Sequence, residues 1–482
     1  MCELDLPLKF AQKLYAEFAI RHPNAFYLRT RQRGMQNWDG KIHYINKHGE
    51  FKIGLLPAVY EKCTEYGIKP KVVDMRQPLP KVSKVVTKIG EYKLRPEQEK
   101  AVKAVINNKV GKVPFQIGVL DYTVNAGKTL IMSSLYLSYK KQLKTLLITN
   151  DSDWLNQARD EFKKYLPGEQ ITFVQGKVLN WSNFTIGMVQ SISRNMRFYQ
   201  NELSKVDMVL VDEADQAGSK QYQNVLTRLF NTRVRIGLSG TIYMSKLAKD
   251  KVKNTNLEVF FGKVLAEFKL KDSIKKGYST RTIVKMVPSK PWYGNWESEE
   301  VSYKEVYDDS ITFNKYARKM VYARLKWNIK QGRYPALVVC KFIAHCEKLC
   351  KYFKKKLGSK YNIACVHVDT PSKIRQQIMK DFREGKIDIL VSTTIIARGK
   401  NFPKLRYLLN AASMDSQEKS IQFLGRLVRT DSSKKKVYLD DLHYPGPYLN
   451  RHGKHRKQYY QKQELKVILL EKIWKNHPIH SL

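Results

Sequence analysis

Acidic residues are scarce in this sequence: its 482 residues include 44 Asp and Glu against 87 Lys and Arg, a formal net charge of +43. Net charge bears on a protein's partners and solubility rather than on its fold. A chain this basic repels itself unless an anionic partner offsets the charge, and the excess is spread along the whole sequence. We therefore expect a nucleic acid partner. The alternatives are an anionic membrane and a place inside a larger assembly.

Long apolar runs are absent as well. No stretch approaches the roughly 18 consecutive apolar residues of a transmembrane helix, and the opening MCELDLPLKF lacks the basic and apolar segments of a secretory signal. We therefore expect a protein of the cytoplasm that acts away from membranes.

Cysteine is sparse, and none of the six cysteines forms a CxxC pair. Without a secretion signal they are expected to be reduced thiols. Cys346 and Cys350 are four residues apart beside His345, and would share one face of a helix. Zinc is the weaker interpretation of this group, because the paired spacing of structural zinc sites is missing.

The sequence of residues 1–88 predicts a small α+β accessory domain that binds nucleic acid. Two helices are expected near residues 6–22 and 57–68, with a hairpin at 41–56 that turns at His48-Gly49.

Arginines and aromatic residues alternate within this domain. Arg31 and Arg33 lie near Tyr27, and Trp38 follows. Basic residues interleaved with aromatic rings suit contact with nucleic acid. The alternative is a solvated hairpin face with a buried Trp38.

Short apolar runs then alternate with helical stretches, which is typical of parallel sheets covered on both faces. The pattern predicts two successive α/β lobes at residues 89–270 and 271–440, followed by a basic helical extension at 441–482. The expected strands lie at 118–122, 145–149, 172–176, 184–189, 208–212, 235–240, 336–340, 363–368, 388–393, 407–412 and 436–442. A helix is expected at 463–474, and residues 286–301 form either a loop with an aromatic plug or an insertion that touches substrate.

One strand–loop–helix sequence has the arrangement that nucleotide binding requires. The run at 118–122 leads into Gly127-Lys128-Thr129, and a helical stretch follows, so backbone amides at the helix N-terminus can face phosphates. Lys128 would reach the β and γ phosphates, and the Thr129 hydroxyl would hold magnesium. The residues expected to hold ATP here are Asn125, Ala126, Gly127, Lys128 and Thr129.

This loop departs from the usual pattern at two positions. Tyr122 stands where a small residue is usual, and Val124-Asn125 replaces a Thr-Gly pair. Asn is the non-glycine residue that best tolerates left-handed backbone, so the loop is still expected to close.

A second element supplies carboxylates. The run at 208–212 ends in Asp212, Glu213, Ala214 and Asp215. At the tip of a strand in the same sheet, Asp212 can hold magnesium and Glu213 can orient and deprotonate an attacking water. Asp215 is expected to tie this segment to neighbouring motifs.

In their order, these motifs resemble those of superfamily 2 helicases, and the resemblance covers about residues 89–440. It implies two tandem RecA-like lobes that use ATP and Mg²⁺. In the segment before the phosphate loop, Gln98 would contact adenine, assisted by Arg95.

Further motifs of the same family follow in order. TIGMVQSIS and ILVSTTIIARGKNF resemble motifs that contact the nucleic acid strand. LSGT resembles the motif that couples ATP hydrolysis to binding of the nucleic acid substrate. The strand contacts implied are Gln190, Ser191, Thr393 and Thr394.

QFLGRLVR resembles the arginine motif of the second lobe. Gln422, Arg426 and Arg429 would complete catalysis, since arginine can offset charge that develops on the γ-phosphate. The resemblance implies that these arginines reach ATP held between the lobes.

A narrower resemblance is to phage UvsW-type helicases, carried by DEAD, LSGT, QxxGRxxR and the N-terminal Trp38-Asp39-Gly40-Lys41. It implies a monomeric DNA helicase that remodels forked and branched DNA in replication, recombination or repair, in the host cytoplasm if the gene is a bacteriophage's. The Ala-x-Thr-Gly loop and His-Arg-Ile-Gly-Arg motif of DEAD-box RNA helicases are missing. The alternatives are an RNA helicase, a duplex translocase without strand separation, and a binding module with a decayed ATP site.

Overall fold

The computed structural model divides the chain into two compact units, residues 1–268 and 269–482. It describes residues 2–3, 5, 7–31, 34–150, 152–240, 242, 248–289, 301–397, 402–415, 420, 423–425, 427–428, 430 and 434–470. No helix in this part of the chain is long and apolar enough to cross a membrane.

The first unit is built on a seven-stranded sheet in which every neighbouring pair is parallel. In sheet order its strands are β13 (Val264–Phe268), β7 (Ile117–Tyr122), β12 (Val234–Ser239), β11 (Met208–Asp212), β8 (Thr145–Thr149), β10 (Phe184–Met188) and β9 (Ile171–Val174). The central strands β7, β8, β11 and β12 are buried along their whole length, as expected when helices cover both faces of a parallel sheet.

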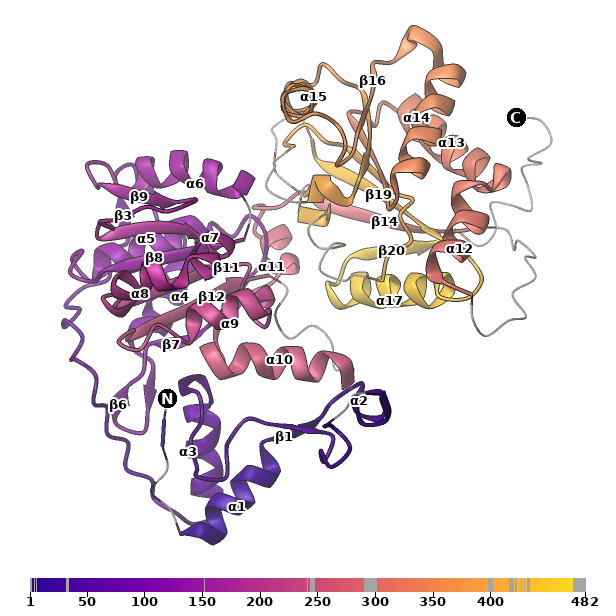
Figure 1. Cartoon of the computed structure of the whole chain (residues 1–482). Coiled ribbons are helices and arrows are strands. Elements are labelled where there is room, and N and C mark those ends of the chain that lie inside the picture. Colours follow the sequence, from indigo (N-terminus) through magenta and orange to yellow (C-terminus); the bar gives the residue numbers. More distant parts are fainter. Residues whose placement is uncertain are drawn as a thin grey trace. The chain divides into compact units, whose positions relative to one another are not determined.

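Helices and short hairpins pack around this sheet (Figure 1). They are β3 (Lys88–Ile89), β4 (Tyr92–Lys93), α4 (Pro96–Ile106), β5 (Lys109–Val110), β6 (Val113–Pro114), α5 (Lys128–Ser138), α6 (Ser152–Tyr165), α7 (Val189–Arg194), α8 (Met196–Ser204), η2 (Ala214–Gln216), α9 (Lys220–Leu226) and α10 (Ala248–Phe261).

The N-terminal segment belongs to the same unit and contacts the lobe through η1 and α10. Its elements are α1 (Leu8–Glu17), β1 (Ala19–Arg21), α2 (Ala25–Arg31), β2 (Lys41–His43), η1 (Ile53–Leu55) and α3 (Leu56–Glu65). Leu14, Phe51, Leu55 and Val59 join the hydrophobic core of the lobe, and burying each such side chain stabilises the fold by about 1.5–3 kcal/mol.

The predicted hairpin at 41–56 is wrong in its pairing. The chain does reverse at Gly49, where φ is +82°, but β2 pairs with β1 rather than with residues 51–55. Phe51 instead forms isolated bridges with Cys2 and Ile45. The residues that follow form the turn of η1, which leads directly into α3 and therefore leaves no second strand.

The second unit repeats the architecture with another seven-stranded, all-parallel sheet. In order its strands are β16 (Ile363–Val366), β17 (Ile389–Thr393), β15 (Ala336–Cys340), β18 (Tyr407–Asn410), β19 (Lys436–His443), β14 (Arg281–Pro288) and β20 (Lys466–Leu469). The helical elements are α11 (Leu270–Lys275), α12 (Tyr303–Tyr307), η3 (Asp308–Thr312), α13 (Lys315–Lys330), α14 (Ile343–Leu357), η4 (Gly358–Lys360), α15 (Ser372–Glu384), η5 (Thr394–Ala397) and α17 (Leu449–Lys462). The predicted pair of RecA-like parallel-sheet lobes is therefore confirmed.

The helix predicted at 463–474 is wrong in its described part. The helix is α17, which lies earlier, and Glu464 beyond its end has a left-handed φ of +52° that interrupts the helical path. Residues 466–469 then form β20 along β14. Inside α17, Arg456 is fully buried and forms an ion pair of 2.8 Å with Asp441 of β19, which anchors the helix to the sheet.

Strands β13 and β14 were not among the expected strands. β14 takes in Met286 to Pro288, the start of the segment predicted as a loop or insertion, while residues 290–300 lie outside the described residues.

Candidate nucleotide-binding site

The phosphate loop follows β7, and Tyr122 at the end of that strand does not occupy the loop. Its side chain is fully buried and its hydroxyl donates a hydrogen bond of 2.6 Å to the Glu97 carbonyl of α4. The unusual tyrosine therefore connects α4 to the strand.

The backbone of the loop has the left-handed residues that a phosphate cradle needs. Asn125 has a φ of +65° and Gly127 a φ of +73°, in line with the expectation that Asn125 can replace glycine. Gly127 is the N-cap of α5, so the first amides of that helix, including those of Lys128 and Thr129, face the loop. This donor set, with the partial positive charge of the helix end, fits a nucleotide phosphate.

Two side chains of the α4 N-terminus hold the loop from outside. Arg95 donates from Nη2 to the Asn125 carbonyl over 3.0 Å, and Gln98 donates from Nε2 to the Ala126 carbonyl over 2.8 Å. A Cβ added at Gly127 would stand 2.3 Å from Gln98 Nε2. Arg95 and Gln98 thus contact the loop, and their predicted contact with adenine stays a prediction.

Thr129 has a partner that the sequence did not indicate. Its Oγ1 donates to Glu161 Oε2 of α6 over 2.8 Å. A hydroxyl has one donor and two acceptor lone pairs, so this bond fixes the side chain while leaving oxygen lone pairs for a cation. Periodicity marks Glu161 only as a polar position on a helix, so no sequence signal singled it out.

The predicted carboxylates lie at the carboxyl end of β11 in the same sheet. Asp212 is buried, and Glu213 has a left-handed φ of +52°. Burial raises the pKa of Tyr222 well above its usual value, and the charges of Glu213 and Asp212 raise it further. A strand-end carboxylate and a threonine hydroxyl are oxygen ligands of the kind that Mg²⁺ prefers.

Asp215 connects this element to the next motif, as predicted. It accepts a hydrogen bond of 2.8 Å from Ser239 Oγ at the end of β12. Gly240 follows, where an added Cβ would stand 2.9 Å from the Cα of Thr123 in the phosphate loop. The LSGT motif therefore lies directly against both the DEAD segment and the loop; its Thr241 lies outside the described residues.

The residues predicted to contact the strand are placed as follows. Gln190, the second residue of α7, is partly exposed and donates to the Asn150 carbonyl over 3.1 Å, with Ser191 beside it. In the second unit, Thr393 ends β17 and Thr394 begins η5. Nucleic acid binding by all four stays a prediction.

In the N-terminal segment, Trp38 is half-buried and its indole donates over 2.9 Å to the carbonyl of Lys41, the first residue of β2. The Arg31 guanidinium lies 5.1 Å from the centre of the Tyr27 ring. Arg33 lies outside the described residues.

The arginine motif is described only in part. Residues 423–425 are helical and buried, while Gln422, Arg426 and Arg429 lie outside the described residues. Their catalytic role stays a prediction.

The cysteines of the second unit gather around α14. Cys346 and Cys350 share its buried face as expected, and Cys346 Sγ lies 3.4 Å from Cys365 Sγ of β16. The hydrogen bond between Cys346 and Cys365, together with burial, raises the pKa of Cys365 to about 12. Among the described residues, no cluster of three or more His, Cys, Asp or Glu side chains is arranged to hold a metal ion.

Two family models match the chain in succession. Residues 91–244 match the model described as "Type III restriction enzyme, res subunit", and residues 318–431 match the "Helicase conserved C-terminal domain". "Putative helicase 22" of a Sulfolobus islandicus filamentous virus is 22% identical over 382 residues. That alignment covers 74% of this chain and 65% of the viral protein, so this chain spans less than two thirds of that relative's length.

Solved structures are also similar. Dbp5 of S. cerevisiae, bound to RNA and ADP BeF3, covers 79% of this chain and 90% of its own, with 14% identity and a TM-score of 0.54; at that identity the likeness concerns the fold alone. The structure of T4 UvsW covers 97% of this chain and 96% of its own, with 19% identity and a TM-score of 0.44. The two family models fall on the two lobes in chain order, and together with the motifs described above they show that this chain belongs to the superfamily 2 helicases.

Proposed function

We propose that this protein is an ATP-dependent helicase or translocase that unwinds or branch-migrates forked and branched DNA in replication, recombination or repair. The observation that carries the ATPase part is the constellation in the first unit: the cradle from Asn125 to Thr129, with Asp212 and Glu213 at the end of β11. Its oxygen ligands, backbone amides and lysine fit a magnesium-bound triphosphate.

The roles of the side chains follow from their chemistry. Bound ATP would supply the phosphoanhydride bond whose hydrolysis drives movement. Lys128, at the start of α5, offers positive charge to the phosphates, and Thr129, fixed by Glu161, offers an oxygen ligand. Glu213, which is partly exposed beside the buried Asp212, would accept the proton of the attacking water.

Replacement of the lysine tests the ATPase. In Lys128→Ala, ATP turnover should fall by about a hundredfold or more, because a cation that stabilises phosphoryl transfer is lost. Nucleic acid binding should be largely retained, measured by anisotropy with a labelled fork. The control is Lys164→Ala, an exposed lysine of α6, which should leave turnover unchanged. Undiminished turnover in Lys128→Ala would refute the assignment.

The proposed contact with branched DNA is supported by an aromatic and basic surface on α2. Phe26 is 80% exposed and Tyr27 55% exposed, with Arg29 and Arg31 exposed beside them. Exposed rings can stack on unpaired bases while arginines attract the backbone. Sequence reasoning noted Tyr27 but missed Phe26.

Phe26→Ala with Tyr27→Ala tests this contact. Unwinding of forks and four-way junctions should fall by about tenfold or more, because base stacking contributes about 1–3 kcal/mol per base. Basal ATP turnover without nucleic acid should not change. Tyr316→Ala, also at a 55% exposed tyrosine, is the matched control and should unwind like the wild type.

A panel of nucleic acid substrates distinguishes a DNA helicase from an RNA helicase. ATPase stimulation and strand separation are measured on forks, four-way junctions, DNA duplexes, RNA–DNA loops and RNA duplexes. We expect the largest stimulation by forks and junctions. Stronger stimulation by RNA duplexes would make the protein an RNA helicase, and stimulation by plain duplex without strand separation would make it a translocase.

A further inference from the structure

A cavity of 540 Å³ lies within the first unit, between the N-terminal segment and the lobe. Its walls come from η1 and α3, the extended residues 70–76, the β5–β6 hairpin, and the ends of α9 and α10. Pockets for small organic molecules typically measure about 300–1,000 Å³, so this cavity has the size of a ligand site.

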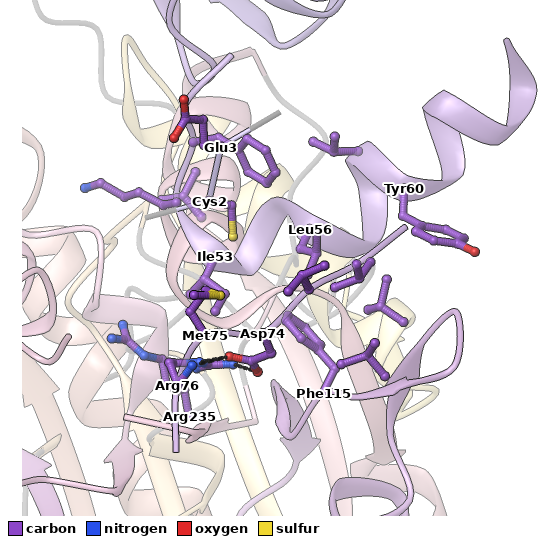
Figure 2. A pocket seen from close by; sticks show the side chains of 18 of the residues that line it. Cys2, Glu3, Ile53, Leu56, Tyr60, Asp74, Met75, Arg76, Phe115 and Arg235 are labelled. Atoms are coloured by element: carbon purple, nitrogen blue, oxygen red, sulfur yellow. Dashed lines mark hydrogen bonds and ion pairs between the residues drawn. The ribbon is translucent and has the colours of Figure 1, made fainter. Parts of the chain in front are cut away.

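Most of the cavity wall is apolar, and the apolar lining continues onto the protein surface. Leu56 and Phe115 line the interior (Figure 2). At the edge, Val73 is 65% exposed, Met75 91% and Phe230 62%. Exposed apolar side chains gathered around an opening mark binding surfaces.

The wall contains the charged residues Glu3, Lys52, Lys71, Asp74, Arg76 and Arg235, and only Arg235 among them is buried. Arg235 of β12 is only 7% exposed and donates to the carbonyls of Leu226 and Leu229. Its Nε is buried without a hydrogen-bond partner, and no ion pair of Arg235 with a carboxylate is found in the described part of the chain. Burial lowers the pKa of Arg235 to about 10, so the guanidinium stays charged at neutral pH.

The neighbouring charges do not neutralise this guanidinium. Asp74 lies close by, but it pairs with Arg76 over 2.8 Å (Figure 2), and it also pairs with Arg233 over 3.4 Å. Lys52, also in the wall, lies 4.3 Å from the centre of the Phe260 ring. A buried charge without a counterion costs several kcal/mol, and water alone supplies no negative charge.

We propose that this cavity binds an organic anion with an apolar body, whose carboxylate or phosphate group pairs with Arg235. The apolar part lies against Leu56, Phe115 and the exposed edge. Because the walls come from both the N-terminal segment and the lobe, the ligand joins the two. The proposal is independent of the ATPase and of the nucleic acid substrate.

Isothermal titration of the full chain tests the site, with dodecanoate, dodecyl phosphate, neutral dodecanol and inorganic phosphate as probes below micellar concentrations. At least one dodecyl anion should bind about tenfold or more tightly than dodecanol and inorganic phosphate, since hydrogen bonds to a charged group contribute about 1.5–3 kcal/mol. The preferred headgroup distinguishes a carboxylate ligand from a phosphate ligand. Equal binding of dodecanol, tighter binding of inorganic phosphate, or no binding of either anion would overturn the proposal.

Three variants locate the site. Arg235→Met should weaken binding of the anion about tenfold or more, while Arg228→Met, at an exposed arginine of the same region, should not. Leu56→Trp keeps Arg235 and fills the cavity, so it should abolish binding of every dodecyl probe. Undiminished binding by this variant would contradict the proposal. A readout on the unaltered chain remains if a variant does not fold: Cys2 lines the cavity, so the bound anion should slow its alkylation by N-ethylmaleimide.

Discussion

At the scale of single residues, the second unit buries a titratable side chain in its neutral form. His345 is 2% exposed, and its Nδ1 lies 2.9 Å from the Tyr307 hydroxyl. Burial lowers the pKa of His345 to about 3, and the opposing effect of Asp308 is smaller. The histidine is therefore neutral in the folded chain at pH values where it is protonated in the unfolded chain.

This difference predicts an acid-labile contribution to stability. The folded pKa lies below the unfolded value of about 6.5, so the unfolded state binds the proton first, and stability falls as pH falls below about 6.5 by about 1.4 kcal/mol per unit. His345→Phe removes this slope, while the Tyr307 hydroxyl keeps a bond from the Lys341 amide. Urea unfolding of both proteins at pH 7, 6 and 5 measures how the free energy of unfolding depends on pH.

His48→Phe, at an exposed histidine, is the control and should unfold with the pH slope of the wild type. A wild type and a His345→Phe variant with parallel stability curves would contradict the prediction.

At the scale of elements, β20 is an edge strand whose only neighbour in the sheet order of the described chain is β14. Leu470, just beyond the end of β20, donates its amide to the carbonyl of Met286 in β14. Because amides alternate in direction along a strand, Ile468 directs its amide to β14 and Val467 directs its amide outward.

Proline replacements therefore distinguish a strand from the helix that the sequence suggested. Ile468→Pro should lower the melting temperature, because it removes a bond of the ladder, whereas Val467→Pro should be tolerated at an open edge. In a helix, both prolines would cost about 3 kcal/mol. Equal, large losses in the two variants would show that the segment is helical.

At the scale of the whole molecule, the charge of +43 should govern affinity for nucleic acid. Each phosphate contact by Lys or Arg releases a counterion, so affinity falls steeply with salt. Affinity for a labelled fork should drop by about tenfold or more between 50 and 200 mM NaCl, with little dependence on base sequence. Anisotropy titrations measure it, and affinity that does not change with salt would argue against contact through the phosphate backbone.

The sequence alone determined the repeated lobes and the backbone conformation of the loop between β7 and α5. Apolar runs of strand length, Gly127-Lys128-Thr129 and the acids after β11 are local signals, because a buried strand, a phosphate loop and a strand-end carboxylate each depend on neighbours along the chain. Asn125 could be assigned left-handed backbone for the same reason.

Only the tertiary structure decided which distant groups meet. The Thr129–Glu161 bond, the pairing of β2 with β1, the pairing of β20 with β14 and the cavity wall that contains Arg235 all join residues that no periodicity relates. Packing overrides local preference at such places, since a short apolar segment forms a strand or a helix according to the surface that covers it.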